Sequence, residues 1–215
     1  MDIARQRDRV VSIISKYASY YNYSNTDEQL IVSSGLLNVI WNNWCQFWRN
    51  YWIFTIQGGI YLDKTLFRGI YPTMTKDQAC AYAAHFKSIP PIRGYTLMDS
   101  IAYHKEPTWG DYDKIINIAS NLSSNTALTI RMHYILALLP SYQDEIKDFQ
   151  IIRNAFIHLN DGAIKELESL RNLYVFSTHS NVVNILNATR IGNTSPCFKS
   201  MTDNMIGVLN NIYEG

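Results

Sequence analysis

The stretch Asp27–Gln57, DEQLIVSSGLLNVIWNNWCQFWRNYWIFTIQ, has the pattern of one long buried helix. Asn25-Thr26-Asp27-Glu28 supplies helix start signals, and Gly58-Gly59 is a plausible end. Large apolar residues recur in steps of three, four and seven, the spacing of a single helix face. They are Leu30, Leu37, Trp41, Trp44, Trp48 and Trp52, widened by Ile40, Phe47, Tyr51 and Phe54. A stripe this broad indicates a helix buried on more than one side.

Helical spacing continues on both sides of this stretch. It predicts helices over 2–21, 111–122, 126–139, 141–159, 163–177 and 200–212. Residues 60–110 hold four of the six prolines, a density that breaks helices, although Thr75-Lys76-Asp77-Gln78 resembles a capping box and predicts one short helix there. No alternating run indicates a sheet. The prediction is therefore an all-α protein, a single domain over 1–215 built as an antiparallel helical bundle with a loop-rich insertion around 60–110.

Composition excludes several classes of protein. With 47% apolar and 17% charged residues the chain can bury a large core, which excludes dominant disorder. A net charge of +1 excludes a strongly polybasic binder of nucleic acid or membranes. The richest apolar run, Leu128–Leu139, is interrupted by Arg131 and His133 and is shorter than the roughly 20 residues of a membrane span. The start of the chain lacks an apolar signal core, so we expect a soluble, cytoplasmic protein with no membrane partner.

Three cysteines, Cys45, Cys80 and Cys197, are widely spaced and form no CxxC pair. This argues against a structural zinc site and against a disulfide framework. Free buried thiols are the simplest interpretation. The sequence predicts no metal and no cofactor.

The segment Ile151–Leu159, IIRNAFIHL, carries the residues best suited to catalysis. On a helix at about 100° per residue, Phe149, Ile152 and Phe156 share the core side with Leu159. Asn154 and His158 stack on the opposite side, flanked by apolar residues, and Arg153 lies between the two faces. Because the outer side is not a charged, solvated face, it suggests a second burial partner, either another helix or a second copy of the chain.

This Arg-Asn-x-x-x-His string resembles the signature of the HEPN superfamily, and its place late in a helical bundle after a proline break is similar too. The resemblance implies a metal-independent RNA endonuclease whose Arg and His residues, from two protomers, line a cleft at a homodimer interface. Arg153 would then stabilise charge on the scissile phosphate. His158 would act as general base or acid, leaving a 2′,3′-cyclic phosphate, and Asn154 would orient the histidine or bind the phosphate.

The residue types suit that chemistry independently. An imidazole takes or gives a proton near neutral pH, and a guanidinium binds two phosphate oxygens at once. RNA carries its own nucleophile, the 2′-hydroxyl. The resemblance further implies a toxin or antiviral-defence role with an antitoxin or regulatory partner protein. Some HEPN toxins carry a modifiable Tyr two residues after the His; Asn160 stands there in this chain, which argues against control by that route.

Other interpretations remain open. Taken alone, His158 is typical of a histidine that stabilises a helix C-terminus, an interpretation that weakens because an Arg and an Asn share its segment. Arg153 is also typical of an ion-pair partner to Glu145 or Asp148. The chain as a whole is compatible with a non-catalytic helical module that dimerises or docks a partner, or with a small-ligand or nucleotide binder built around 60–110. Further basic residues for an RNA path are Arg49, Arg5, Arg7 and Arg9, and His133 is a lesser candidate for the cleft.

Overall fold

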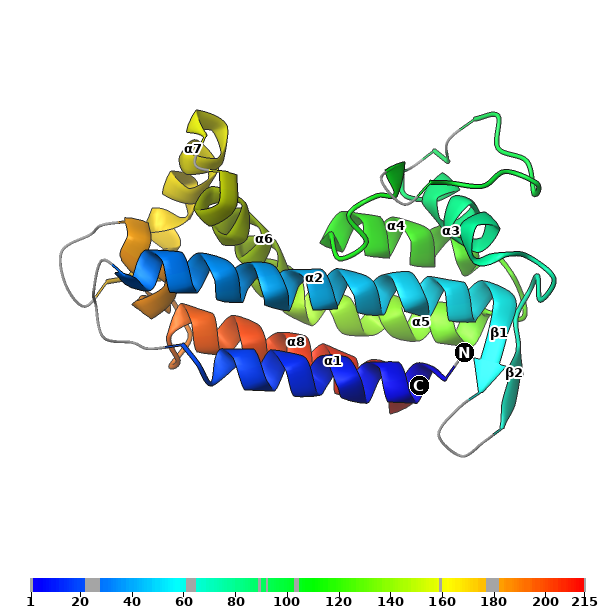
Figure 1. The fold of residues 1–215 in the computed structure, drawn as a ribbon, viewed down its shortest axis with the longest axis horizontal. Coiled ribbons are helices and arrows are strands. Elements are labelled where there is room, and N and C mark those ends of the chain that lie inside the picture. The colour runs from blue at the N-terminus through cyan, green and yellow to red at the C-terminus, as the bar shows by residue number, and fades with distance from the viewer. Residues whose placement is uncertain are drawn as a thin grey trace. The chain divides into compact units, whose positions relative to one another are not determined.

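The long apolar helix predicted at 27–57 is present as α2 (Glu28–Gln57) in the computed structural model (Figure 1). The structure describes residues 2–21, 28–60, 65–88, 90–91, 93–102, 105–158, 160–176 and 182–214. The start signals at 25–27 lie outside these residues. The tryptophan stripe is core, as predicted: Trp44, Trp48 and Trp52 are fully buried.

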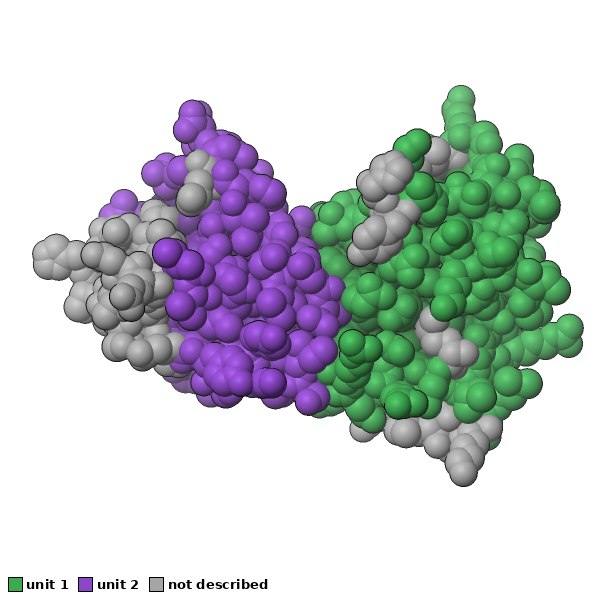
Figure 2. Space-filling model, viewed as in Figure 1, with its two compact units in different colours: residues 1–10, 44–141, 208–215 green, residues 11–43, 142–207 purple. Residues whose placement is uncertain are grey.

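Contacts within the chain divide it into two compact units (Figure 2). Unit 1 comprises residues 1–10, 44–141 and 208–215, and unit 2 comprises residues 11–43 and 142–207. Helices α1 (Ile3–Ala18), α2 and α8 (Cys197–Glu214) contribute residues to both units. Helices predominate in each, which confirms the predicted all-α class. The single domain over 1–215 stays a prediction.

Unit 1 is built from the second half of α2 and the segments that follow it. These are β1 (Gly58–Ile60), β2 (Leu66–Arg68), α3 (Lys76–His85), α4 (Tyr112–Leu122) and α5 (Thr129–Leu138). The two strands pair antiparallel, with Gly59 opposite Phe67, and α4 packs against α5. The guanidinium carbon of Arg131 on α5 lies 4.5 Å from the centre of the Phe67 ring, so a cation–π contact joins α5 to the hairpin.

The short helix predicted inside 60–110 is α3, and its capping box is confirmed. The Thr75 hydroxyl accepts a hydrogen bond from the Gln78 backbone N–H, and the Gln78 side chain accepts one from the Thr75 N–H. Two otherwise unpaired backbone donors are satisfied in this way. The helix therefore starts at the place where the sequence indicates.

The end of the 60–110 stretch is bound to α2 by hydrogen bonds. The Glu106 carboxylate accepts two hydrogen bonds from Arg49, at 2.6 and 2.7 Å, and a third from the Trp109 indole at 2.6 Å. The Trp44 indole donates to the Gly110 carbonyl at 2.9 Å. These charge-assisted and buried contacts hold the approach to α4 firmly against the core helix.

Unit 2 centres on α6 (Gln143–His158), which packs against α7 (Asp161–Leu170). Trp41 of α2 stacks on Phe149 of α6 with ring centres 5.8 Å apart, and Tyr21 stacks on Phe198 of α8 at 4.2 Å. The 3₁₀ turn η2 (Leu139–Tyr142) precedes α6 in the chain. Between α7 and α8 come η3 (Arg171–Leu173), β3 (Tyr174–Val175), η4 (Val182–Asn187) and β4 (Thr189–Arg190), with the two strands paired antiparallel.

Several boundaries differ from the prediction, for local reasons. The helix expected from 126 begins at Thr129, because the Asn125 side chain accepts a hydrogen bond from the Ala127 N–H and closes a turn. The helix expected to reach 177 ends at Leu170, and the chain then turns so that Tyr174 enters the core. The last helix begins at Cys197 instead of 200. The two strand pairs were not predicted, because strands of two or three residues are too short to show alternation.

Candidate active site on helix α6

Helix α6 buries the face that its sequence predicts. Phe149, Ile152 and Phe156 are in the core, and the predicted Leu159 lies outside the described residues. Ala155, placed on the outer side by periodicity, is also buried, and Ile151 is half-buried. The helix is therefore covered over a wider arc than one face, as its apolar outer side indicated.

Arg153 is half-buried and is held by two amide oxygens. Its Nη2 donates to Asn38 Oδ1 on α2 at 2.7 Å, and its Nη1 donates to Asn154 Oδ1 at 3.0 Å. Both acceptors are neutral, so these two hydrogen bonds orient the planar guanidinium without cancelling its charge. Asp148, one of the carboxylates that the sequence offered as a partner, is instead bound by Tyr174 and Arg190.

His158 is the last residue of α6, and its side chain is exposed. The end of the helix is anchored two residues before His158, where the Ser34 hydroxyl on α2 donates to the Phe156 carbonyl at 3.1 Å. Asn160 then caps the next helix, since its Oδ1 accepts from the Ala163 N–H at 2.9 Å. The imidazole thus stands at the end of an anchored helix and remains accessible to water.

Asn154 lies directly beside Arg153 in the chain and acts on it. The sequence suggested that Asn154 orients the histidine or binds phosphate, and the structure places its carbonyl oxygen on the guanidinium. An amide has both a carbonyl oxygen and an NH2 group. With the oxygen engaged by Arg153, the NH2 group is the part of Asn154 suited to donate hydrogen bonds to an anion's oxygen atoms.

Asn38 and Ser34 are site residues that the sequence did not single out. Both come from α2 and lie four residues apart, which places them on one face of the helix. Asn38 meets Arg153, and Ser34 meets the backbone of α6. The sequence held a signal for Asn38, because it lies one turn before Asn42, and further polar residues follow on the same helix at Gln46, Arg49 and Asn50.

A buried ionic cluster lies earlier on α6. Asp148 is 4% exposed; it accepts a 2.6 Å hydrogen bond from the Tyr174 hydroxyl and forms a 3.1 Å ion pair with Arg190. Arg190 also pairs with Asp144 at 2.9 Å. Burial raises the pKa of Asp148 above its usual value, although Tyr174 and Arg190 act to lower it. The cluster joins α6 to β3 and β4 and so fixes the helix that carries Arg153.

The remaining sequence candidates have other surroundings. Arg49 is paired with Glu106, and Arg7 with Asp8 at 2.6 Å. His133 on α5 is exposed. Cys80 and Cys197 are buried thiols outside any disulfide, as predicted, and Cys45 is half-buried and likewise in no disulfide.

No family model, curated protein or solved structure matches this chain. Among the described residues, no helix combines the length and the apolar character that crossing a bilayer requires. Within the same residues, no group of three or more His, Cys, Asp and Glu side chains has an arrangement that would hold a metal ion.

Proposed function

We propose that this chain is a metal-independent endoribonuclease of the HEPN type, with Arg153 and His158 as catalytic residues and Asn154 as a supporting group. One observation carries the proposal: α6 combines an exposed imidazole with a guanidinium that neutral amides hold in place. The two residues are five positions apart, about 7.5 Å along the helix axis. A guanidinium oriented in advance stabilises charge that develops during a reaction without first having to reorganise.

The proposed reaction uses the 2′-hydroxyl of RNA as its nucleophile. The 2′-oxygen attacks the adjacent phosphorus, the bond from phosphorus to the 5′-oxygen breaks, and the products are a 2′,3′-cyclic phosphate and a 5′-hydroxyl. His158 takes the proton from the 2′-hydroxyl or gives one to the leaving 5′-oxygen. Arg153 binds the phosphate oxygens, on which negative charge develops.

The proposal includes a homodimer with a composite cleft. Five residues turn a helix by about 500°, so Arg153 and His158 leave α6 roughly 140° apart. Two copies related by a two-fold axis place an Arg of one beside a His of the other. Two imidazoles in one cleft also supply a base and an acid together. We further propose a cytoplasmic toxin or antiviral-defence role restrained by an antitoxin or regulatory partner.

The primary test is cleavage of a mixed-sequence RNA by the purified protein in EDTA. We expect Arg153→Ala and His158→Ala each to slow cleavage by about 100-fold or more, a range typical of lost acid–base or electrostatic groups. The exposed His133 on α5 offers a matched control, and His133→Ala should cleave at the wild-type rate. Equal cleavage rates for the wild type and all three variants would show that Arg153 and His158 of α6 take no part in cleavage.

A mixed dimer tests the composite cleft separately. Arg153→Ala and His158→Ala subunits carrying different tags are co-expressed, and the doubly tagged species is purified. A cleft shared between protomers retains one Arg and one His in this species, so cleavage should partly recover. A site contained within one protomer gives none. A stable dimer of the wild type with no RNA turnover would favour the non-catalytic docking module.

A further inference from the structure

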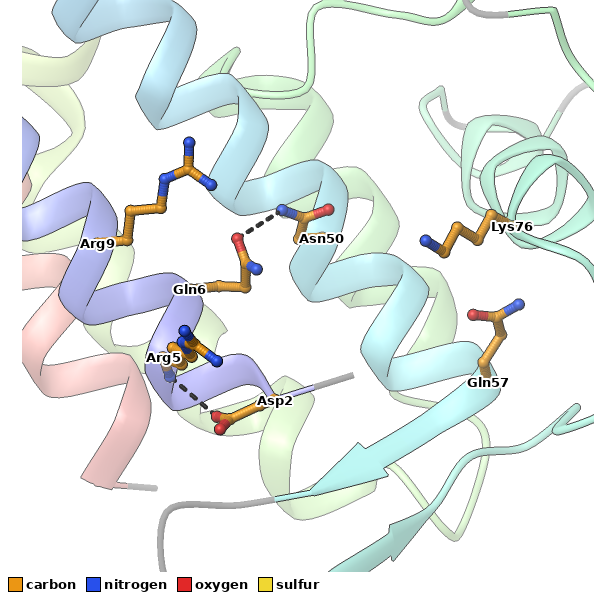
Figure 3. Close-up of a pocket in the computed structure, with 7 residues that line it drawn as sticks. All are labelled: Asp2, Arg5, Gln6, Arg9, Asn50, Gln57 and Lys76. Atoms are coloured by element: carbon orange, nitrogen blue, oxygen red, sulfur yellow. Dashed lines mark hydrogen bonds between the residues drawn. The ribbon is translucent and has the colours of Figure 1, made fainter.

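Unit 1 contains a basic pocket that the proposed ribonuclease site does not use. It has a volume of about 740 Å³ and lies between the start of α1, the second half of α2 and the start of α3 (Figure 3). Three cations line it: Arg5 and Arg9 from α1 and Lys76 from α3. Asp2 is the acidic residue in the lining, so the charges are three positive against one negative.

These three cations are available to a ligand. All three side chains are exposed, and none forms an ion pair with any residue that the structure describes. The neighbouring Arg7 differs, because it lies outside the lining and pairs with Asp8. The Asp2 carboxylate is partly engaged, since its Oδ1 accepts a 2.9 Å hydrogen bond from the Arg5 backbone N–H. The pocket therefore favours an anion.

The polar frame of the pocket is already assembled. Asn50 of α2 donates to Gln6 of α1 at 3.3 Å, the contact drawn as a dashed line in Figure 3. Gln57 at the end of α2 donates to the Met74 carbonyl at 2.6 Å, which fixes the turn leading to Lys76. The cations thus stand on elements whose mutual positions are set without a ligand, which lowers the entropic cost of binding.

We propose that this pocket binds the phosphate groups of a nucleotide. Phosphates carry multiple charges and several acceptor oxygens, which suit two guanidinium forks and an ammonium group. The volume falls within the range of small-ligand sites, about 300–1,000 Å³, and exceeds what one inorganic phosphate fills. The side-chain amides in the lining offer both donors and acceptors to the edge of a base. The inference does not depend on RNA cleavage.

The test is titration of the whole 215-residue chain with ATP in EDTA, followed by calorimetry or tryptophan fluorescence. We expect saturable binding with a Kd below about 1 mM that weakens as salt is raised. Arg9→Gln and Lys76→Gln remove the charge but keep a polar side chain of high helix propensity, and each should weaken binding about fivefold or more. Arg7→Ala removes a charge from the same helix outside the pocket and should change the Kd less than about twofold.

Two further probes separate the sources of the phosphate. Pyrophosphate reports recognition of the phosphates alone. A 2′-O-methyl RNA 12-mer reports a polynucleotide strand and cannot be cleaved by attack of its own 2′-oxygen. If the 12-mer displaces ATP, and its affinity falls in the same variants, the natural phosphate belongs to a polynucleotide strand. If the 12-mer does not compete with ATP, the pocket takes a free nucleotide. Unchanged affinity for every probe in Arg9→Gln and Lys76→Gln would overturn the proposal.

Discussion

Arg153 Nη2 donates to Asn38 Oδ1 across the contact between α6 and α2, at 2.7 Å. This hydrogen bond fixes the orientation of the planar guanidinium, and its acceptor is a neutral amide oxygen. A carboxylate at the same place would bind the guanidinium more strongly but would also neutralise it. Asn38 therefore orients the Arg153 guanidinium without adding a negative charge beside it.

Substitutions at Asn38 should separate orientation of Arg153 from its charge. Asn38→Ala removes one hydrogen bond to a charged group, so it should lower the free energy of unfolding by about 1.5–3 kcal/mol and the rate of cleavage by roughly tenfold. Asn38→Asp should preserve or raise stability yet lower cleavage further, since the carboxylate competes with phosphate. Single-turnover cleavage and urea unfolding measure both effects. The exposed Asn42, one turn along α2, provides the control Asn42→Ala, and wild-type cleavage by Asn38→Asp would argue against a role for the charge of Arg153.

The buried Asp148 predicts a pH dependence of stability. Burial raises its pKa in the folded protein above the unfolded value of about 3.9. The folded state therefore binds this proton more tightly, and the associated stability is complete below the unfolded pKa and lost as pH rises through the folded pKa. We expect the stability of the wild type relative to Asp148→Asn to fall over that window. Urea unfolding at a series of pH values from about 3 upward measures it, and a constant difference would contradict the assignment.

The three thiols should differ in reactivity. Burial raises the pKa of both Cys80 and Cys197 to about 12, so about one in 10,000 is ionised at pH 8. Cys45 is half-buried. We expect iodoacetamide at pH 8 to label Cys45 well before the other two, as mapped by peptide mass spectrometry. All three should react alike in 8 M urea, and early labelling of Cys80 or Cys197 in the folded protein would count against their burial.

Two glycines should respond to alanine in opposite directions. Gly58 has φ of +90°, and an added Cβ would clash with the Phe67 carbonyl oxygen and lie 2.6 Å from the Gly69 nitrogen. Gly58→Ala should therefore destabilise the protein by about 2–4 kcal/mol. Gly35, inside α2, has nothing within 4 Å of an added Cβ, and Gly35→Ala should stabilise by about 0.5–1 kcal/mol. Thermal unfolding measures the stability of both variants. Unchanged stability of Gly58→Ala would contradict the positive φ and the close backbone contacts at Gly58.

Much of the secondary structure could be predicted from local patterns. The buried tryptophans of α2, the capping box of Thr75 and the core side of α6 all follow from spacing within one segment. Ala155 shows the limit of this approach. Periodicity places it on the outer side, but its burial depends on which neighbouring elements cover α6.

The partners of the candidate site residues were harder to predict, because they come from distant parts of the chain. Asn38 and Arg153 are separated by 115 positions, so no local spacing pairs them. The basic pocket combines α1 with Lys76 of α3 in the same manner. In such cases the sequence indicates which side chains are chemically able to act, and only helix packing brings them together.

Helix α7 begins only a few residues after His158, the last residue of α6. Two residues separate His158 from the start of α7, and Asn160 closes the first turn of that helix. The buried face of α7 is formed by Ala163, Leu167 and Leu170, and we expect the packing of this face to influence where the ring sits. A screen for inactive variants should accordingly find substitutions in this buried apolar face as well as in the motif itself, even though none of those aliphatic side chains takes part in the chemistry.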